Sequence, residues 1–224
     1  MPGQTPRQRA REETLRRIKT LALGQLAEGG AGELSLRAIA RELNIVSSAI
    51  YRYFGSRDEL ITALITDAYN DLADVLEAAT ASGRRSPRRR WRDISAALRD
   101  WARNEPHRFG LIYGTSIPGY HAPQTTVGPA ARVYGAFCNS VAESVGGQPE
   151  LHGRRLRTQL ADLTAFTGLT IDDRSMLALV AAFARLIGFV GMELGGHFVG
   201  VFEPADDAFA ALVEREADHL GLDS

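Results

Sequence analysis

The sequence predicts an all-α protein of about nine or ten helices, in which a three-helix domain with a helix-turn-helix precedes a larger helical domain. Apolar residues recur at intervals of three and four along much of the chain, as on the buried faces of helices. Gly, Pro or Asn interrupts this pattern between segments. Near residue 45 two short helical segments meet at a tight turn, the outline of a helix-turn-helix. We expect the first domain at residues 1–56 and the second at residues 57–224.

Composition limits the class of protein. An apolar fraction of 45% can build a core, and the single cysteine, Cys138, excludes an intrachain disulfide and suits a reducing cytosol. The sequence shows neither a signal peptide nor an unbroken apolar stretch that could span a membrane. The most apolar segment, Met176 to Leu194, is interrupted by Arg185 and Glu193 and predicts a buried helix. We therefore expect a cytoplasmic protein with no membrane partner.

Charge is unevenly distributed along the chain. Residues 1–60 contain ten Arg or Lys and seven Asp or Glu, a net +3, whereas the remainder has 16 against 20, a net −4. This asymmetry favours a polyanion as partner of the N-terminal part. The first dozen residues predict a flexible basic arm whose Arg7, Arg9 and Arg11 either lie along DNA or remain solvated. The first helix follows, at about Leu15 to Leu26.

The segment Ser35 to Leu60 predicts two short helices, a turn and the start of a long helix. Ser35 is placed to cap the first helix, and Asn44 tolerates the left-handed conformation that ends it. The second helix is expected at about Ser47 to Phe54. The first helix has its apolar residues at the i, i+3, i+4, i+7 spacing of a buried face, namely Leu36, Ile39, Ala40 and Leu43.

The second helix has two distinct faces at about 100° per residue. Val46, Ile50 and Phe54 share the predicted core face. The opposite face is hydroxylated, small or cationic, which suits contacts with base edges, while neighbouring Tyr and Arg side chains suit phosphate contacts. The candidate DNA-binding residues are Ser35, Arg37, Ser47, Ser48, Ala49, Tyr51, Arg52, Tyr53 and Arg57.

This segment resembles the DNA-binding domain of tetracycline-repressor (TetR) family regulators. The residues that match the family pattern are Ile39-Ala40, Ile50-Tyr51, Tyr53-Phe54 and Leu60. The departures are Asn44 for the usual Gly, Ile45 for Val, Val46 for Ser and Arg57 for Lys. The change at Val46 matters most because the family's Ser often caps the recognition helix; here Ser47 or Ser48 has to do so. The resemblance implies a bacterial protein, associated with the nucleoid, that binds a double-stranded DNA operator.

Beyond this domain the chain predicts further helices. The one from Arg57 to about Ala79 is long enough to link the two domains mechanically. The arginine-rich run from Gly83 to Arg90 is interpreted as a solvated loop rather than a second nucleic-acid patch. The remaining helices are expected at 91–104, 107–113, 127–145, 154–166, 176–194 and 206–220, with a Pro- and Gly-rich loop at 114–129.

The second domain resembles the WHG-type C-terminal domain of one TetR subgroup, through Asp100-Trp101-Ala102, Pro106-His107 and the run Arg185 to His197. This resemblance implies an effector pocket between helices, mostly apolar with a few polar groups. Glu193, on an apolar helix, has to face a cavity or pair with a cation such as an Arg. The candidate ligand-binding residues are Trp101, Phe109, Tyr113, Tyr120, His121, Tyr134, Phe137, Phe166, Phe189 and Glu193.

The last two helices are the expected dimer interface, a four-helix bundle across a two-fold axis. Small residues along the penultimate helix permit close approach of a partner helix, which has to offset the low helix propensity of Gly. One recognition helix reads few base pairs, so two copies about 34 Å or a multiple of that distance apart are expected on the operator. The candidate interface residues are Ala184, Gly188, Gly191, Gly195, Phe209, Leu212 and Val213.

The sequence carries little that indicates catalysis. It lacks a Walker loop and a dinucleotide-binding glycine motif, its five His show no metal-ligand spacing, and Cys138 falls on an apolar stripe. We therefore expect no enzyme activity, no metal and no cofactor. The interpretation is a homodimeric repressor released from DNA by a small-molecule effector. A ligand-binding protein that no longer reads DNA and a transcriptional activator remain alternatives.

Overall fold

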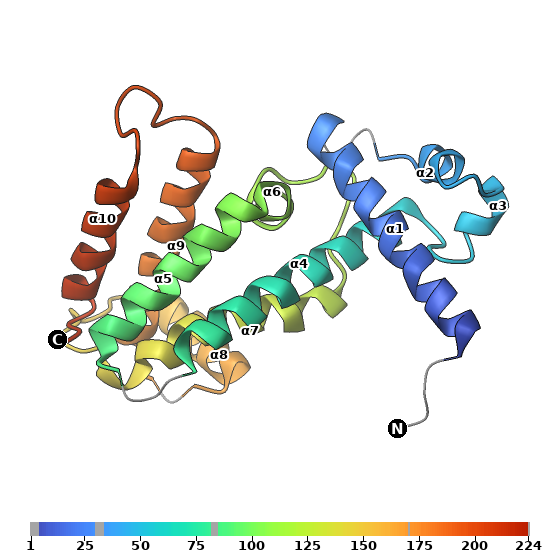
Figure 1. Ribbon diagram of the computed structural model, residues 1–224. Coiled ribbons are helices and arrows are strands. Elements are labelled where there is room, and N and C mark those ends of the chain that lie inside the picture. The colour runs from blue at the N-terminus through green and yellow to red at the C-terminus, as the bar shows by residue number, and fades with distance from the viewer. Residues whose placement is uncertain (1–4, 30–33, 82–84, 170, 224) are drawn as a thin grey trace. The chain divides into compact units, whose positions relative to one another are not determined.

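The computed structural model describes residues 5–29, 34–81, 85–169 and 171–223, without the side chains of Ala142, Phe166 and Thr167. These residues form α-helices and two single-turn 3-10 helices with no β-strand among them, which confirms the all-α class (Figure 1). The α-helices described are α1 (Pro6–Gly29), α2 (Leu36–Glu42), α3 (Ser47–Ile50), α4 (Arg57–Thr80), α5 (Pro87–Asn104), α6 (Pro106–Tyr113), α7 (Val127–Val141), α8 (Arg154–Thr167), α9 (Asp173–Leu194) and α10 (Asp206–His219).

The chain divides into two compact units. The N-terminal unit comprises Met1–Ala68 together with His107–Thr126, and the C-terminal unit comprises Tyr69–Pro106 together with Val127–Ser224. Helix α4 belongs to both, because Ala68 lies halfway along it. Its observed bounds agree with the helix expected from the sequence.

Helix α1 begins at Pro6, earlier than the apolar pattern from Leu15 predicts. The backbone N–H of Gln8 donates to Thr5 Oγ1 at 3.3 Å, and the backbone N–H of Thr5 donates to Gln8 Oε1 at 2.8 Å. This reciprocal pair is a capping box, and Pro6 follows at the first helical position, where its missing N–H costs nothing. The prediction of a flexible arm is therefore wrong from Thr5 onward, and residues 1–4 lie outside the described part of the chain.

The predicted caps of α2 are confirmed. Ser35 Oγ accepts the backbone N–H of Ala38 at 3.3 Å, and Asn44 has a φ of 53°, in the left-handed region. The N–H of Ser35 itself donates to Gln25 Oε1 of α1 at 2.9 Å. The core of this unit is apolar and fully or almost fully buried, and includes Ile18, Ala22, Leu36, Ile39, Ala40, Leu43, Ile50, Phe54, Leu60, Ile61 and Leu64.

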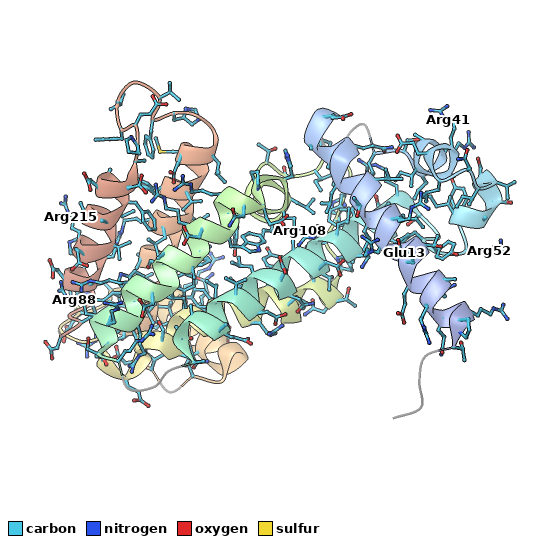
Figure 2. All side chains as sticks on the ribbon, in the orientation of Figure 1. Glu13, Arg41, Arg52, Arg88, Arg108 and Arg215 are labelled. Carbon is cyan, nitrogen blue, oxygen red and sulfur yellow. The ribbon has the colours of Figure 1, made fainter. Side chains whose placement is uncertain are left out.

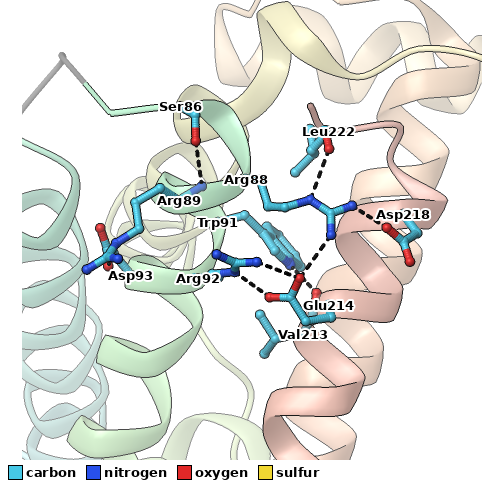
Figure 3. A network of polar contacts seen from close by, with 10 residues as sticks. All are labelled: Ser86, Arg88, Arg89, Trp91, Arg92, Asp93, Val213, Glu214, Asp218 and Leu222. Carbon is cyan, nitrogen blue, oxygen red and sulfur yellow. Dashed lines mark hydrogen bonds and ion pairs between the residues drawn. The ribbon is translucent and has the colours of Figure 1, made fainter. Parts of the chain in front are cut away.

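In the C-terminal unit α5 packs against α7, α9 and α10 through the face predicted from the sequence, with Trp91, Ile94, Leu98 and Trp101 buried. The helix starts at Pro87 rather than near Trp91, because Ser86 Oγ accepts the N–H of Arg89 as an N-cap. Arg88, Arg89 and Arg90 of the predicted loop therefore lie on a helix, as Figure 3 shows for the first two.

Arg88 bridges α5 to α10. It pairs with Glu214 at 2.9 Å and with Asp218, and its Nε donates to the carbonyl oxygen of Leu222 at 3.2 Å (Figure 3). Arg92 binds Glu214 as well, with one contact at 2.8 Å. Three acceptor groups of the protein itself thus receive guanidinium N–H groups from α5, so Arg88 and Arg92 have partners without a second polyanion.

Helix α9 is the only helix in the described ranges that is long and apolar enough, by length and composition alone, to cross a membrane. Its buried residues instead pack in the core of the C-terminal unit, against α5, α7, α8 and α10. About 33% of the apolar window is buried in the single chain. The helix therefore has a packed side and an open side.

Candidate nucleic-acid interface

The helix-turn-helix is formed by α2, the turn Leu43–Val46 and α3. Helix α3 is shorter than predicted: it spans Ser47–Ile50 and continues to Phe54 as turns closed by backbone hydrogen bonds from Tyr53 and Phe54 to Ile50. Both segments bury their apolar residues in the N-terminal unit, so their polar residues face outward.

Two predictions for α3 are wrong. Val46, expected in the core, is 69% exposed, and Ala49, expected at the DNA, is 8% exposed. Val46 has φ −64° and ψ 140°, so it is the N-cap residue outside the helix, and counting 100° per residue from it displaced the predicted faces. Its side chain makes no capping hydrogen bond, and neither Ser47 nor Ser48 occupies the cap position.

The other outward residues lie as predicted. Ser47, Ser48, Tyr51 and Arg52 are exposed, with Tyr51 45% exposed. Arg52 and Arg41 extend into solvent from the N-terminal unit (Figure 2). The resulting surface combines two small hydroxyls, a phenol and a guanidinium, which are donors and acceptors suited to base edges and phosphates.

The remaining DNA candidates surround this surface in different ways. Arg37 is exposed, whereas Ser35 is half-buried and its hydroxyl caps α2. Tyr53 is half-buried, and the guanidinium carbon of Arg11 lies 5.2 Å from its ring centre. That cation–π contact connects the basic start of α1 to the end of α3, and no sequence pattern predicted it.

The start of α4 is fixed directly after α3. Ser56 Oγ accepts the N–H of Glu59 at 3.0 Å, while Glu59 Oε2 accepts the N–H of Gly55 at 2.7 Å. Such reciprocal capping holds the chain where it leaves α3. Nearby, Arg57 lies 3.6 Å from Asp58.

The candidate ligand-binding residues fall into both compact units. Phe109, Tyr113, Tyr120 and His121 belong to the N-terminal unit, where the rings of Phe109 and Tyr113 lie 5.3 Å apart. Tyr120 shares a hydrogen bond of 2.9 Å with Thr62 of α4, and His121 is exposed. The other described candidates, Trp101, Tyr134, Phe137, Phe189 and Glu193, lie in the C-terminal unit, and the side chain of Phe166 is outside the description.

In the C-terminal unit two of these residues are engaged in polar pairs. Trp101 Nε1 donates to Asp71 Oδ2 of α4 at 2.9 Å. Glu193 accepts two hydrogen bonds from Arg99, at 2.8 and 2.6 Å, and Arg99 also reaches Asp206 at 3.1 Å. The expectation that Glu193 finds an arginine is confirmed.

Tyr134 and Phe137 belong to an aromatic cluster on α7 and α9. The ring of Phe183 lies 5.7 Å from Tyr134 and 5.1 Å from Phe137, both edge to face. Burial raises the pKa of the Cys138 thiol to about 12, an effect partly opposed by its hydrogen bond with Tyr134. Burial also raises the pKa of Tyr134. Both groups are neutral near pH 7, so Cys138 packs as a small apolar residue rather than serving as a nucleophile.

The candidate dimer residues separate into open and buried sets. On α9 Ala184, Gly188 and Gly195 are exposed, and a Cβ added to Gly188 would meet nothing within 4 Å. On α10 Leu212 is half-buried, but Phe209 and Val213 are each 5% exposed. These last two face the protomer's own core, and their assignment to a dimer surface is wrong.

The reason is visible in their contacts. Phe209 packs against Phe189, with 5.5 Å between ring centres, and under the guanidinium of Arg99 at 4.9 Å. The carbonyl oxygen of Val213 accepts Trp91 Nε1 at 2.9 Å. An amphipathic pattern marks a buried face without saying which partner covers it.

Two surface hollows lie among the described residues of the C-terminal unit. One of about 500 Å³ is polar and lies between the loop at Glu150 and the start of α9. The other, of about 440 Å³, is lined by the loop at Gly147–Leu151, by α9 and by the end of α10. The predicted ligand-binding residues line neither.

Comparisons with known proteins agree with this arrangement. Residues 18–64 match the model for bacterial regulatory proteins of the tetR family, and residues 91–215 match the model for the tetracyclin repressor-like C-terminal domain. The chain is 38% identical over 202 residues to the HTH-type transcriptional regulators Rv1816 of Mycobacterium tuberculosis and Mb1846 of Mycobacterium bovis, covering 86% of this chain and 85% of each relative.

Solved structures give the same result. The crystal structure of regulatory protein SCO4313 has 34% identity and a TM-score of 0.79, with 95% of this chain and 98% of that chain covered. A protein of unknown function from Rhodococcus sp. RHA1 shares the fold at 22% identity, with a TM-score of 0.70 and coverage of 93% and 95%.

Proposed function

Because the chain belongs to the TetR family of bacterial transcriptional regulators, we propose that it acts in the cytoplasm as a homodimeric repressor that a small-molecule effector releases from its operator. Regulation of transcription through a DNA-binding N-terminal domain is the function of the family, and repression with effector release is its norm. The family is one of regulators rather than enzymes.

The outward surface of α3 carries this proposal. Ser47, Ser48 and Arg52 enter the major groove and contact base edges, and Tyr51 contacts a phosphate. So short a helix reads few base pairs, each good contact being worth about 1–3 kcal/mol. A dimer doubles the site and places the two reading surfaces about 34 Å, or a multiple, apart.

The open side of α9 supports the dimer. Gly188 and its small neighbours offer a line along which a second helix approaches closely, and Met192 beside it is 48% exposed. Covering such a face removes apolar surface from water, at about 25 cal/mol per Å². The symmetry mate of α9 is the partner helix in this proposal.

Effector release operates through α4. Within the C-terminal unit α4 is held by Trp101 at Asp71 and by Arg132, which donates to Asp74 at 2.7 Å and to Glu77 at 2.8 Å. An effector that binds among the aromatic residues of α5, α7 and α9 alters the packing of α5 or α7. That change displaces the part of α4 that follows Ala68 and belongs to the C-terminal unit. The effector shifts the population from the DNA-binding conformation to the released conformation. The size of this shift is limited by the difference in the effector's affinity for the two conformations.

A gel-shift titration against DNA upstream of the protein's own coding region tests the proposal. We expect binding at least about 10³-fold tighter than to unrelated DNA of the same length, and a smaller preference in Arg52→Ala, which loses one base contact in each reading surface. Equal affinity for both DNAs would favour the alternative of a helical ligand-binding protein that does not read an operator. A reporter driven by the same DNA then separates repression from activation.

A further inference from the structure

An exposed apolar segment follows α9. Residues 196–203, named here the arm, carry Val199, Val201 and Phe202, which are 69%, 70% and 49% exposed. The segment is anchored, because the ring of Phe198 lies 4.8 Å from that of Phe189 on α9 and 5.7 Å from that of Phe202. Three large apolar side chains held in water on an ordered segment indicate a surface that another molecule covers.

An apolar groove lies at the opposite end of the same helix. This is the hollow of about 440 Å³, whose apolar wall includes Pro149, Leu151, Leu177, Ala181 and Leu220. Its two arginines are already neutralised: Arg185 donates to Glu216 at 2.6 and 2.7 Å, and Arg174 lies 3.6 Å from Asp172. The groove therefore suits an apolar occupant.

The arm cannot reach the groove of its own chain. Helix α9 rises about 26 Å between Leu177 and Leu194 at 1.5 Å per residue. The loop between α9 and α10 lies at one end of this helical pair, and the C-terminus lies at the other (Figure 1). The occupant has to come from a second molecule.

One line of α9 connects the two features. With Gly188 at zero and about 100° per residue, Leu177, Ala181 and Ala184 fall within roughly 40° of it, and so do Met192 and Gly195. The groove and the root of the arm are thus on one face, the open side that the proposed function assigns to the dimer.

A two-fold axis perpendicular to α9 at Gly188 accounts for both features. Within α9 such an axis sets residue 188 + n of one copy level with residue 188 − n of the other, so Leu194 is level with Ala182. The arm continues beyond Leu194 and is therefore directed toward the part of the partner's α9 that carries Leu177. In the same register Met192 meets Ala184, which joins a large side chain to a small one. We propose that the arm of each copy fills the groove of its partner, so that the dimer is closed by reciprocal exchange of arms.

This proposal rests on the proposed function, since it needs α9 as the dimer helix, and engineered cysteines test the two separately. Leu177→Cys combined with Val199→Cys should give a covalent dimer on a non-reducing gel after mild oxidation, while each single variant should stay uncrosslinked. Native Cys138 is buried and gives no background. Ala96→Cys, on an exposed site of α5, is the control for random collisions.

Gly188→Cys separates the outcomes. Crosslinking of Gly188→Cys with itself, without a Leu177–Val199 crosslink, would keep the α9 dimer and overturn arm exchange. Self-crosslinking of Val199→Cys alone would indicate parallel helices and overturn it too. A monomer in sedimentation with no crosslink at Gly188 would remove the dimer and hence the proposed function.

A charge in the arm gives a second measurement. Val199→Asp should raise the dimer dissociation constant by about tenfold or more, since burial of a valine is lost and a carboxylate enters an apolar groove. Val46→Asp is the matched control, because Val46 is also 69% exposed but lies in the N-terminal unit. Equal dissociation constants for the two variants in analytical ultracentrifugation would overturn the proposal.

Discussion

Arg99 donates to both carboxylate oxygens of Glu193, from Nε at 2.8 Å and from Nη2 at 2.6 Å, while its guanidinium lies 4.9 Å from the ring centre of Phe209. One side chain of α5 thereby contacts α9 and α10 together, and a further hydrogen bond of 3.1 Å reaches Asp206 at the start of α10. The side chains of Arg99 and Glu193 are 8% and 16% exposed, so this is an ion pair inside the protein rather than a surface contact.

Replacing Arg99 by Ala should therefore lower the free energy of unfolding by about 3 kcal/mol, because a largely buried carboxylate loses its partner. Urea unfolding followed by circular dichroism measures the change. Arg16→Ala is the control, since Arg16 pairs with Glu13 at 2.6 Å on the surface of α1 and should show no measurable change. Equal stabilities of the two variants would contradict a structural role for the Arg99 pair.

Trp101→Phe should weaken control of DNA binding. The change removes the N–H that holds Asp71 on α4, a bond to a charged group worth about 1.5–3 kcal/mol. Operator affinity, measured by fluorescence anisotropy below the melting temperature, should change because α4 is less firmly held in the C-terminal unit. Trp91→Phe is matched: it loses a hydrogen bond to the Val213 carbonyl but touches no residue of α4 through that bond. If Trp91→Phe alters affinity equally, global destabilisation explains both.

Local signals in the sequence were sufficient for most helices. Ser35 and Asn44 mark the ends of α2 through capping and left-handed backbone, which depend only on neighbouring atoms. The capping box at Thr5 and the Ser86-Pro87 start of α5 depend on equally local signals, Thr with Gln three residues later and Ser followed by Pro. Element bounds set by local hydrogen bonds are within reach of sequence reasoning.

Partners across the fold were harder to predict. The pattern placed Glu193 in an apolar helix and required a cation, but Arg99 lies 94 residues away and could not be chosen from sequence. The one sequence signal for Arg99 was its position between Leu98 and Ala102, two apolar residues that are buried and that place Arg99 near the core. Phe209 and Val213 were wrongly assigned to the dimer interface, because the periodicity of apolar residues does not distinguish a face buried in the core from a face buried in an interface.

Val46→Ser should stabilise the N-terminal unit. Val46 has the extended backbone of an N-cap but no side-chain oxygen, so a hydroxyl there can accept an N–H from the first turn of α3, typically worth about 1 kcal/mol. Thermal unfolding should show a higher melting temperature than wild type. Val46→Ala removes the exposed methyl groups without adding an acceptor, so its melting temperature should not rise in this way. If both variants raised the melting temperature equally, the gain would come from the loss of exposed apolar surface and not from capping.

Arg52→Ala should relax sequence preference on the operator. The side chain is exposed beyond α3, and loss of one base contact costs about 1–3 kcal/mol at that base pair only. Affinities for a set of single-base operator variants measure this. Tyr51→Phe should instead weaken binding to all of them alike, as expected for a phosphate contact. A uniform loss in Arg52→Ala would make Arg52 a phosphate contact as well.

The free energy of unfolding should fall as pH rises above about 9, because of Cys138. Burial raises the pKa of its thiol from 9.0 to about 12. Below pH 9 both states keep the proton; between about 9 and 12 only the folded state does, so deprotonation stabilises the unfolded chain. From pH 8 to pH 10 this group should cost about 1 kcal/mol. Urea titrations at pH 8 and pH 10 should show a smaller loss of unfolding free energy in Cys138→Ala than in the wild type. Identical losses in the two proteins would show that burial does not hold the thiol protonated.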